Sequence, residues 1–220
     1  MGTFVITIDG PSSSGKGTVA KLLAKKLGFN YLDSGSLYRS VAYIVDANCI
    51  DIININLIIE ELKRNKIELI NDCIFLNSVD ISFKLRDEKI GMLASKLATN
   101  FEIRDFLLGM QRNFANECNL VTDGRDMGSV VFPNATLKIF LTADTVVRAN
   151  RRFLQLQSLG KCVKMNTILL DIKTRDEVDS LRSIAPLIFD DSYRVLDNTN
   201  LSIDETVDLI VNWYAEIINK

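Results

Sequence analysis

The chain has 220 residues, enough for one large domain with a substantial buried core, and 47% of them are hydrophobic. Its 26 basic and 28 acidic residues leave a net charge of −2, which gives no general attraction to nucleic acid or to an acidic membrane surface. Histidine, the most frequent general base, is absent, and four scattered cysteines without a C-x-x-C pair favour a reduced, cytoplasmic protein over a disulfide framework.

The first feature along the chain is an apolar, β-branched run at 4–8, which predicts a short buried strand. A glycine-rich stretch of the form G-x-x-x-x-G-K follows it, and an amphipathic helix comes next. Glycines at 10 and 15 let the loop wrap so that backbone N–H groups point inward, while Lys16 reaches the terminal phosphates. We therefore predict a triphosphate site made of Gly10, Pro11, Ser12, Ser13, Ser14, Gly15, Lys16, Gly17 and Thr18.

The end of this motif departs from its commonest form. The position after the lysine holds Gly17, and the hydroxyl comes one residue later, at Thr18. A Lys-Gly-Thr ending is more typical of nucleoside monophosphate kinases than of GTPases. The pattern leaves open whether Thr18 contacts Mg²⁺ directly or through water.

Both strands and helices are predicted in the rest of the first half of the chain. Patterns of apolar and turn residues predict a strand at 30–33, helices at 37–45 and 56–64, a hairpin of 66–70 with 73–77, and a helical stretch at 85–114 broken near 99–100.

In the second half, the run at 120–123 is a short apolar strand that ends on Asp123. Gly-Arg-Asp-Met-Gly follows at 124–128. A strand ending on a carboxylate is what a P-loop protein places beside its metal, so Asp123 joins Thr18 as a candidate Mg²⁺ ligand.

The remaining elements complete an alternating order. We expect a strand at 137–141, an arginine-bearing helix after it, a loop at 160–167, a helix at 171–181, a strand at 195–197, and a last helix opened by a Ser202–Glu205 capping box. Strands alternating with helices predict an α/β fold, a parallel sheet covered by helices on both faces. One domain with a hairpin-bearing insertion is the expected organisation.

A kinase that joins ATP to a second phosphate compound must neutralise two approaching groups of negative charge and hold donor and acceptor in line. Arginine suits this task because its planar fork stays charged and binds phosphate in a bidentate manner. With Lys16, the arginines predicted to act in catalysis are Arg125, Arg148, Arg152 and Arg182.

Over almost its whole length the chain resembles bacterial cytidylate kinases. The resemblance is carried by Ile8-Asp9-Gly10-Pro11 with the Gly15-Lys16-Gly17-Thr18 ending, Leu32-Asp33-Ser34-Gly35, Tyr38-Arg39, Ala94-Ser95, Arg104, Gln111-Arg112, Asp123-Gly124-Arg125-Asp126-Met127-Gly128, Arg148-Ala149 with Arg151-Arg152, Arg175-Asp176, Asp179-Ser180 with Arg182, and Ala185-Pro186-Leu187. The phosphate loop alone is common to many families, whereas the Asp-Gly-Arg-Asp-Met-Gly stretch is far more specific.

The resemblance implies a P-loop NTPase-type core at about 1–38, 115–147 and 168–220, a monophosphate-binding region at about 39–114, and a lid at about 148–167. It implies transfer of the γ-phosphoryl group of ATP to CMP or dCMP, with Mg²⁺, in pyrimidine nucleotide metabolism. The residues it places around the monophosphate are Ser34, Arg39, Ser95, Arg104, Arg125, Asp126, Arg175, Asp179 and Arg182.

Chemistry suggests a role for several of these residues. Asp126 suits the exocyclic amine of cytosine, with Arg104 and Ser95 facing its acceptors. Asp179 suits sugar hydroxyls, and arginines 39, 125 and 182 suit the phosphate. No general base is expected, because the attacking phosphate oxygen is already ionised.

Two alternatives stay open. In the first alternative, the chain is a kinase for another nucleotide, such as UMP or AMP. In the second, it is a P-loop switch, but the Asn-Lys-x-Asp motif by which switch GTPases recognise guanine is not found in the sequence. We expect a monomer that binds ATP and CMP or dCMP but neither nucleic acid nor membrane, since no apolar run approaches about 18 residues and no signal peptide is visible.

Overall fold

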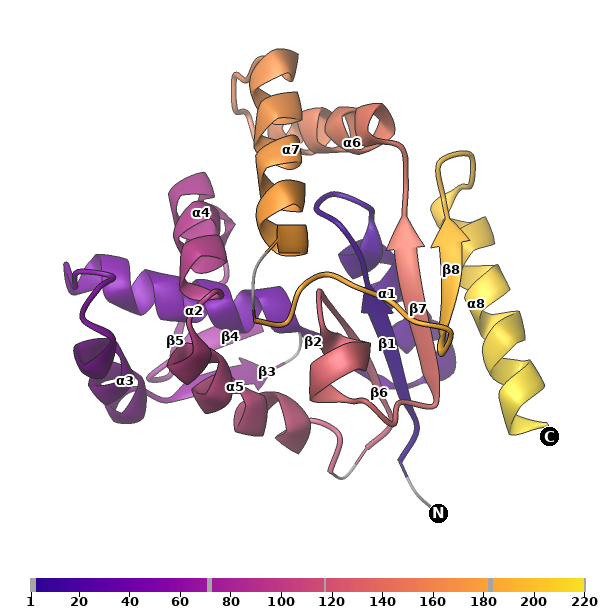
Figure 1. Cartoon of the computed structure of the whole chain (residues 1–220), viewed down its shortest axis with the longest axis horizontal. Helices are drawn as coiled ribbons and strands as arrows, with labels where there is room; N and C mark the ends of the chain where they lie inside the picture. The colour runs from indigo at the N-terminus through magenta and orange to yellow at the C-terminus, as the bar shows by residue number, and fades with distance from the viewer. Residues whose placement is uncertain (1–2, 71–72, 117, 182–183, 220) are drawn as a thin grey trace. The chain divides into compact units, whose positions relative to one another are not determined.

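The computed structural model describes residues 3–70, 73–116, 118–181 and 184–219. The chain divides into two compact units (Figure 1). We call residues 1–31 with 115–220 the sheet unit and residues 32–114 the helical unit.

The sheet unit is built on a five-stranded sheet in the order β2-β6-β1-β7-β8. Its strands are β1 (Val5–Asp9), β2 (Asn30–Asp33), β6 (Leu120–Gly124), β7 (Leu137–Thr142) and β8 (Tyr193–Asp197), and the last two residues of β2 already belong to the helical unit along the chain. The pairs β1–β6, β1–β7 and β7–β8 are parallel. All five residues of β1 are buried, as expected of a central strand covered on both faces.

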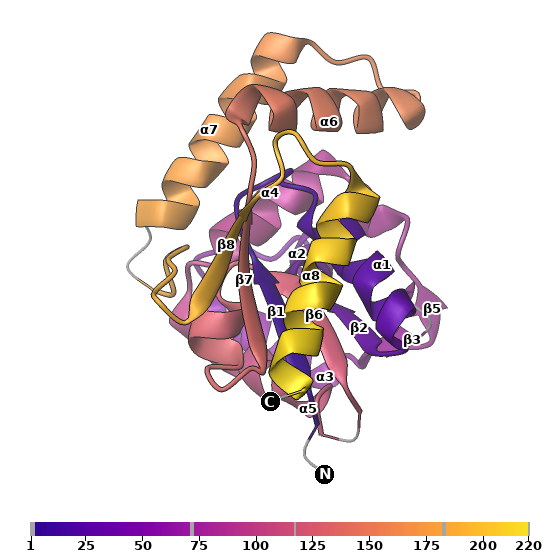
Figure 2. The same ribbon diagram turned by 90° about the vertical axis from the view of Figure 1, so that its right-hand side faces the viewer.

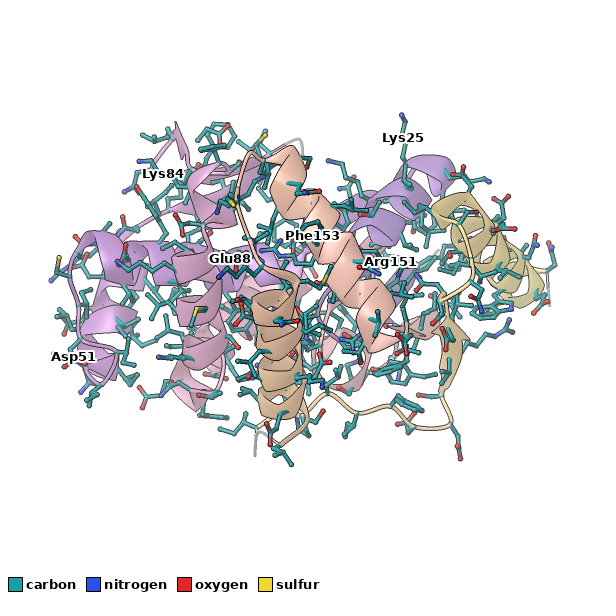
Figure 3. The ribbon with its side chains drawn as sticks, turned by 90° about the horizontal axis from the view of Figure 1, so that it is seen from above. Lys25, Asp51, Lys84, Glu88, Arg151 and Phe153 are labelled. Carbon is teal, nitrogen blue, oxygen red and sulfur yellow. The ribbon has the colours of Figure 1, made fainter. Side chains whose placement is uncertain are left out.

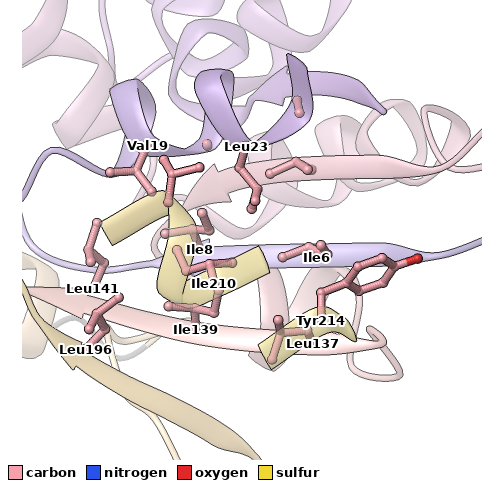
Figure 4. Packing of buried hydrophobic residues seen from close by; sticks show 14 residues of the cluster. Ile6, Ile8, Val19, Leu23, Leu137, Ile139, Leu141, Leu196, Ile210 and Tyr214 are labelled. Atoms are coloured by element: carbon pink, nitrogen blue, oxygen red, sulfur yellow. The ribbon is translucent and has the colours of Figure 1, made fainter. Parts of the chain in front are cut away.

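The helices of this unit are α1 (Lys16–Leu27), the five-residue π-helix η2 (Met127–Val131), α6 (Thr145–Ser158), α7 (Met165–Leu181) and α8 (Ile203–Ile218). Helices α1 and α8 (Figure 2) share one apolar core with β1 and β7. Ile8, Leu23, Ile139 and Ile210, labelled in Figure 4, are fully buried in it. Burial of each such side chain contributes about 1.5–3 kcal/mol. Helices α6 and α7 pack on each other through a second, smaller cluster.

In its described residues, 32–70 and 73–114, the helical unit holds the hairpin strands and five helical segments. Its elements are α2 (Ser34–Ala47), α3 (Ile55–Arg64), β3 (Ile67–Ile70), β4 (Cys73–Leu76), β5 (Val79–Asp80), the 3₁₀ turn η1 (Lys84–Arg86), α4 (Glu88–Leu97) and α5 (Phe101–Asn113). The side chains of Asp33, Asn54, Asp87 and Asn100 cap the four α-helices by accepting backbone N–H bonds.

The expected α/β fold is confirmed, as are the hairpin strands, the helix break near residue 100 and the Ser202 capping box. The hairpin turn at 71–72 lies outside the described residues, and the third strand, β5, was not expected. The predicted loop at 160–167 is too long, because α7 already begins at Met165. That helix buries only three residues, so its apolar pattern is weak. No described helix is long and apolar enough to cross a membrane.

Candidate active site

The predicted triphosphate site is the turn between β1 and α1. The backbone needs a glycine at position 10, because a Cβ there would lie 2.1 Å from the carbonyl oxygen of Leu141. Gly15, in the left-handed region with φ 90°, starts α1 without a capping side chain. The first N–H groups of α1 therefore face the loop with the helix dipole behind them, which is a geometry that binds anions. The Lys16 ammonium lies over the same turn and donates to the Pro11 carbonyl oxygen at 3.1 Å.

The carbonyl oxygen of Ser14 in this turn receives two side-chain donors from elsewhere in the sheet unit. Arg151 of α6, labelled in Figure 3, donates to it at 3.1 Å. Asn198, directly after β8, donates its amide N–H at the same distance. Arg151 also bonds the Asn198 side-chain and backbone oxygens, each at 2.9 Å. Burial lowers the pKa of Arg151, and Asp197 opposes this effect. These two side chains, which lie outside the phosphate loop in sequence, fix the Ser14 carbonyl oxygen of the loop.

Neither Arg151 nor Asn198 belongs to the predicted site. Arg151 had two signals in the sequence, its place among the arginines of the helix after 137–141 and its place in the Arg151-Arg152 pair that carries part of the family resemblance. Asn198 follows the carboxyl end of a parallel strand, which is where such sheets collect functional groups.

The two α6 arginines that are predicted catalytic residues lie in different environments. Arg148 is 5% exposed and donates to the carbonyl oxygens of Ala143 and Ser12, to the Thr145 hydroxyl, and to Asp176 of α7 at 2.7 Å. Arg152 lies partly exposed and donates to Gln155 at 2.7 Å. The structure thus ties Arg148 to the phosphate loop and to α7.

Asp123, the predicted metal ligand, is buried at the end of β6. It accepts a 2.8 Å hydrogen bond from the Tyr31 hydroxyl, and its carboxylate oxygens are 3.6 and 3.8 Å from where a Cβ on Gly17 would stand. Thr18 is exposed in the first turn of α1. Carboxylate and hydroxyl oxygens are hard ligands that suit Mg²⁺, and no cluster of three or more metal-binding side chains occurs among the described residues. This donor set fits a magnesium ion shared with phosphates and water.

Residues 124–131, which we call the β6 exit segment, contain two predicted site residues. The Arg125 guanidinium contacts Asp179 of α7 at 2.5 Å. Burial disfavours the charged form of Arg125, but the charge and hydrogen bond of Asp179, with the nearby charges of Asp123 and Asp176, together outweigh this and raise its pKa. Asp126 is buried at the start of η2, and the N–H groups of Val130 and Val131 bond its carbonyl oxygen. Half-buried Arg175 lies one turn before Asp179, and Arg182 is outside the described residues.

In the helical unit, the predicted residues lie on α2, α4 and α5. Ser34 is buried and accepts a 2.8 Å bond from Gln111, a residue absent from the predicted site. Arg104 is buried, donates to the Ala98 carbonyl oxygen at 3.0 Å, and lies 5.6 Å from the ring centre of Tyr38. Arg39 bonds the Leu85 carbonyl oxygen at 3.3 Å, and Ser95 is half-buried on α4.

A strand–loop–helix phosphate cradle with its lysine, on a parallel sheet with a buried aspartate near the end of the neighbouring strand, defines a P-loop nucleotide-binding protein. The chain belongs to the cytidylate kinase family, whose family model matches residues 6–216. It is therefore a kinase, an enzyme of the transferase class.

Similar proteins agree with this assignment. The cytidylate kinase of Polynucleobacter asymbioticus is 46% identical over 217 residues, covering 97% of each chain. That of Thermodesulfovibrio yellowstonii is 43% identical over 217 residues, covering 96% of this chain and 98% of the relative.

Among solved structures, an uncharacterized protein from Eubacterium ventriosum matches with a TM-score of 0.57 at 16% identity, over 97% of this chain and 99% of that one. A gluconokinase from Sinorhizobium meliloti matches with a TM-score of 0.50 at 15% identity, over 98% and 94%. At such low identity these two matches support the fold alone.

Proposed function

We propose that this enzyme transfers the γ-phosphoryl group of ATP to CMP or dCMP and releases ADP with CDP or dCDP. Family membership supports the acceptor class. The observation that carries the chemistry is the Lys16 cradle with the buried Asp123 carboxylate beside Gly17. An anion-binding turn next to a hard-oxygen ligand is what a magnesium triphosphate requires.

On the ATP side, the N-terminal N–H groups of α1 and the Lys16 ammonium bind the phosphate oxygens. Asp123 and Thr18 would hold the magnesium ion, directly or through water, and the ion would supply positive charge to the triphosphate. Lys16 exchanges its 3.1 Å bond to the Pro11 carbonyl oxygen for a phosphate oxygen, so the loop keeps the ammonium in place between substrates. This pre-positioning lowers the reorganisation needed during transfer.

On the acceptor side, Arg39, Arg125 and Arg182 hold the CMP phosphate, with Arg175 nearby in sequence. Asp126 accepts from the cytosine amine, Arg104 and Ser95 face the base's acceptors, Ser34 lines the same region, and Asp179 accepts from the sugar. Existing contacts support part of this set, since Asp179 orients Arg125 at 2.5 Å and Gln111 orients the Ser34 hydroxyl at 2.8 Å. Side chains locked by such partners lose little entropy on binding.

During transfer, Lys16 and arginines 125, 148, 152 and 182 spread the charge of the transferring group. No general base takes part, because the attacking phosphate oxygen is ionised. Residues 148–167 act as a lid that excludes water, and the enzyme works as a cytoplasmic monomer.

The decisive experiment is a panel of CMP, dCMP, UMP, AMP and GMP in an assay that couples ADP release to a colour change. We expect CMP and dCMP to be phosphorylated with a kcat/KM at least tenfold above that of the other three nucleotides. A preference for UMP or AMP would make this a kinase for that nucleotide. Slow ATP hydrolysis that no acceptor stimulates would instead indicate a P-loop switch.

A further inference from the structure

Asp9, the last residue of β1, is a buried carboxylate with no role in the proposed transfer. It is completely buried and lies in the sheet unit directly before the phosphate loop. Its two oxygens accept hydrogen bonds from the backbone N–H groups of Met127 and Gly128, each at 2.8 Å, and from the Tyr193 hydroxyl at 3.0 Å. Burying a charged carboxylate is costly unless several donors compensate it, so this arrangement calls for an explanation.

The three donors identify Asp9 as the cap of the β6 exit segment. The first N–H groups of any helical turn lack partners within the helix, and a side chain at the N-cap often accepts from them. Here the N-cap residue is Asp126, and its side chain makes no capping bond. Asp9 accepts from the N–H groups of Met127 and Gly128 instead, across the sheet from β1. The Asp9 carboxylate, which is remote in sequence, therefore accepts the hydrogen bonds that the side chain of the N-cap residue Asp126 would accept in an ordinary helix.

The fit of this contact depends on the glycine at 128. A Cβ there would lie 2.6 Å from the Tyr193 hydroxyl and 2.7 Å from the Thr7 hydroxyl. Both distances are below normal contact, so a larger residue would move the segment away from Asp9. Gly128 thus brings the backbone close enough for its N–H group to reach the carboxylate.

We propose that Asp9 is a positioning residue for the nucleotide acceptor, which holds the β6 exit segment so that the Asp126 side chain serves base recognition instead of helix capping. The inference rests on the proposed function, because it assigns the purpose of Asp9 through the proposed role of Asp126. It concerns the acceptor and not ATP, even though Asp9 is adjacent to the phosphate loop in sequence.

The test is Asp9→Asn, which preserves shape but turns one oxygen into an amide that cannot accept the Met127 or Gly128 N–H group. We expect the KM for CMP to rise about tenfold while the KM for ATP changes less than twofold. A purely structural role would lower the active fraction, and so the apparent kcat, without separating the two KM values. An equal rise in both values, or no rise in either, would overturn the proposal.

A double-mutant cycle sharpens the test. If Asp9 acts through Asp126, the pair Asp9→Asn with Asp126→Ala should have the same KM for CMP as Asp126→Ala alone, within about twofold. Multiplicative effects would mean that Asp9 acts elsewhere. Wild-type enzyme assayed in parallel separates the two hypotheses, because its failure to phosphorylate CMP would refute the proposed function itself.

Two further variants keep the test valid if Asp9→Asn folds poorly. Gly128→Ala should reproduce the CMP-selective defect by displacing the same N–H group. Tyr193→Phe removes one donor from Asp9 but leaves both backbone bonds, so the KM for CMP should rise less than threefold. A Tyr193→Phe defect as large as that of Gly128→Ala would show that packing around Tyr193, and not the capping bonds, matters.

Discussion

The phosphate loop and the β6 exit segment make an instructive pair. Both leave neighbouring parallel strands at the same edge of the sheet, since Ile8 pairs with Asp123 and Asp9 with Gly124. The first leads into the 12-residue helix α1, and the second contains a π-helix of five residues. The loop takes its form from its own glycines and from the helix that follows. The exit segment takes its form from Asp9 and Tyr193, which are remote in sequence.

This difference follows from what each part binds. A phosphate is recognised by backbone N–H groups and a helix dipole, so a local sequence pattern is sufficient to build the cradle. A base is recognised by individual side chains at fixed positions, which need support from other elements. Substitutions in the two regions should therefore differ in the substrate whose binding they weaken.

The largest effect is expected from Lys16→Met, which removes the ammonium from the phosphate loop. Turnover should fall about a thousandfold, because charge stabilisation in the transition state is lost. The steady-state rate of ADP release measures this loss, and circular dichroism checks the fold. Lys25→Met is the matched control, since Lys25 is exposed on the same helix (Figure 3), and near-normal turnover of Lys16→Met would contradict the cradle.

Next in size is Asp126→Ala in the β6 exit segment. The KM for CMP should rise ten- to a hundredfold, since a hydrogen bond to a charged group contributes about 1.5–3 kcal/mol. The KM for ATP should stay within twofold. The exposed acid Glu177, replaced by alanine, serves as the control. If both KM values rose together, base recognition would lie elsewhere.

Asn198→Ala should have a smaller effect than Asp126→Ala, and it should weaken the binding of ATP instead of CMP. This change removes one of the two donors to the Ser14 carbonyl oxygen and the acceptor for Arg151. One hydrogen bond of about 1 kcal/mol corresponds to a roughly fivefold rise in the KM for ATP, with CMP little changed. Asn212→Ala on the exposed face of α8 is the control. A CMP-selective defect would break the division between the regions.

The smallest effect is a pH dependence of stability from Asp9. Burial raises its pKa from 3.8 to about 6, against the hydrogen bonds from Gly128 and Met127 that lower it. Between these two values the folded protein binds more protons than the unfolded chain, so this group lowers the free energy of unfolding as the pH rises. Thermal melts of wild type and Asp9→Asn from pH 4 to pH 7 should show the variant gaining relative stability up to about pH 6. A constant difference would contradict the raised pKa.

Local patterns in the sequence determined most of the fold. The apolar run at 4–8 and the glycines at 10 and 15 specify a strand and a turn with few other conformations available. Asn100 and Ser202 cap helices through bonds to residues three positions away. Each of these features depends on residues that are close together in the chain, so it can be predicted from the amino-acid sequence. The candidate phosphate site could be predicted for the same reason.

Tertiary structure alone decided how the site residues are supported. Arg148 reaches Ser12 and Asp176, Arg151 reaches Ser14, and Asp9 reaches Gly128, and no spacing in the sequence predicts these partners. Parallel strands put residues more than a hundred positions apart at one edge of the sheet, and burial there makes hydrogen-bond partners obligatory. Which partner each buried group finds is therefore settled only when the chain has folded.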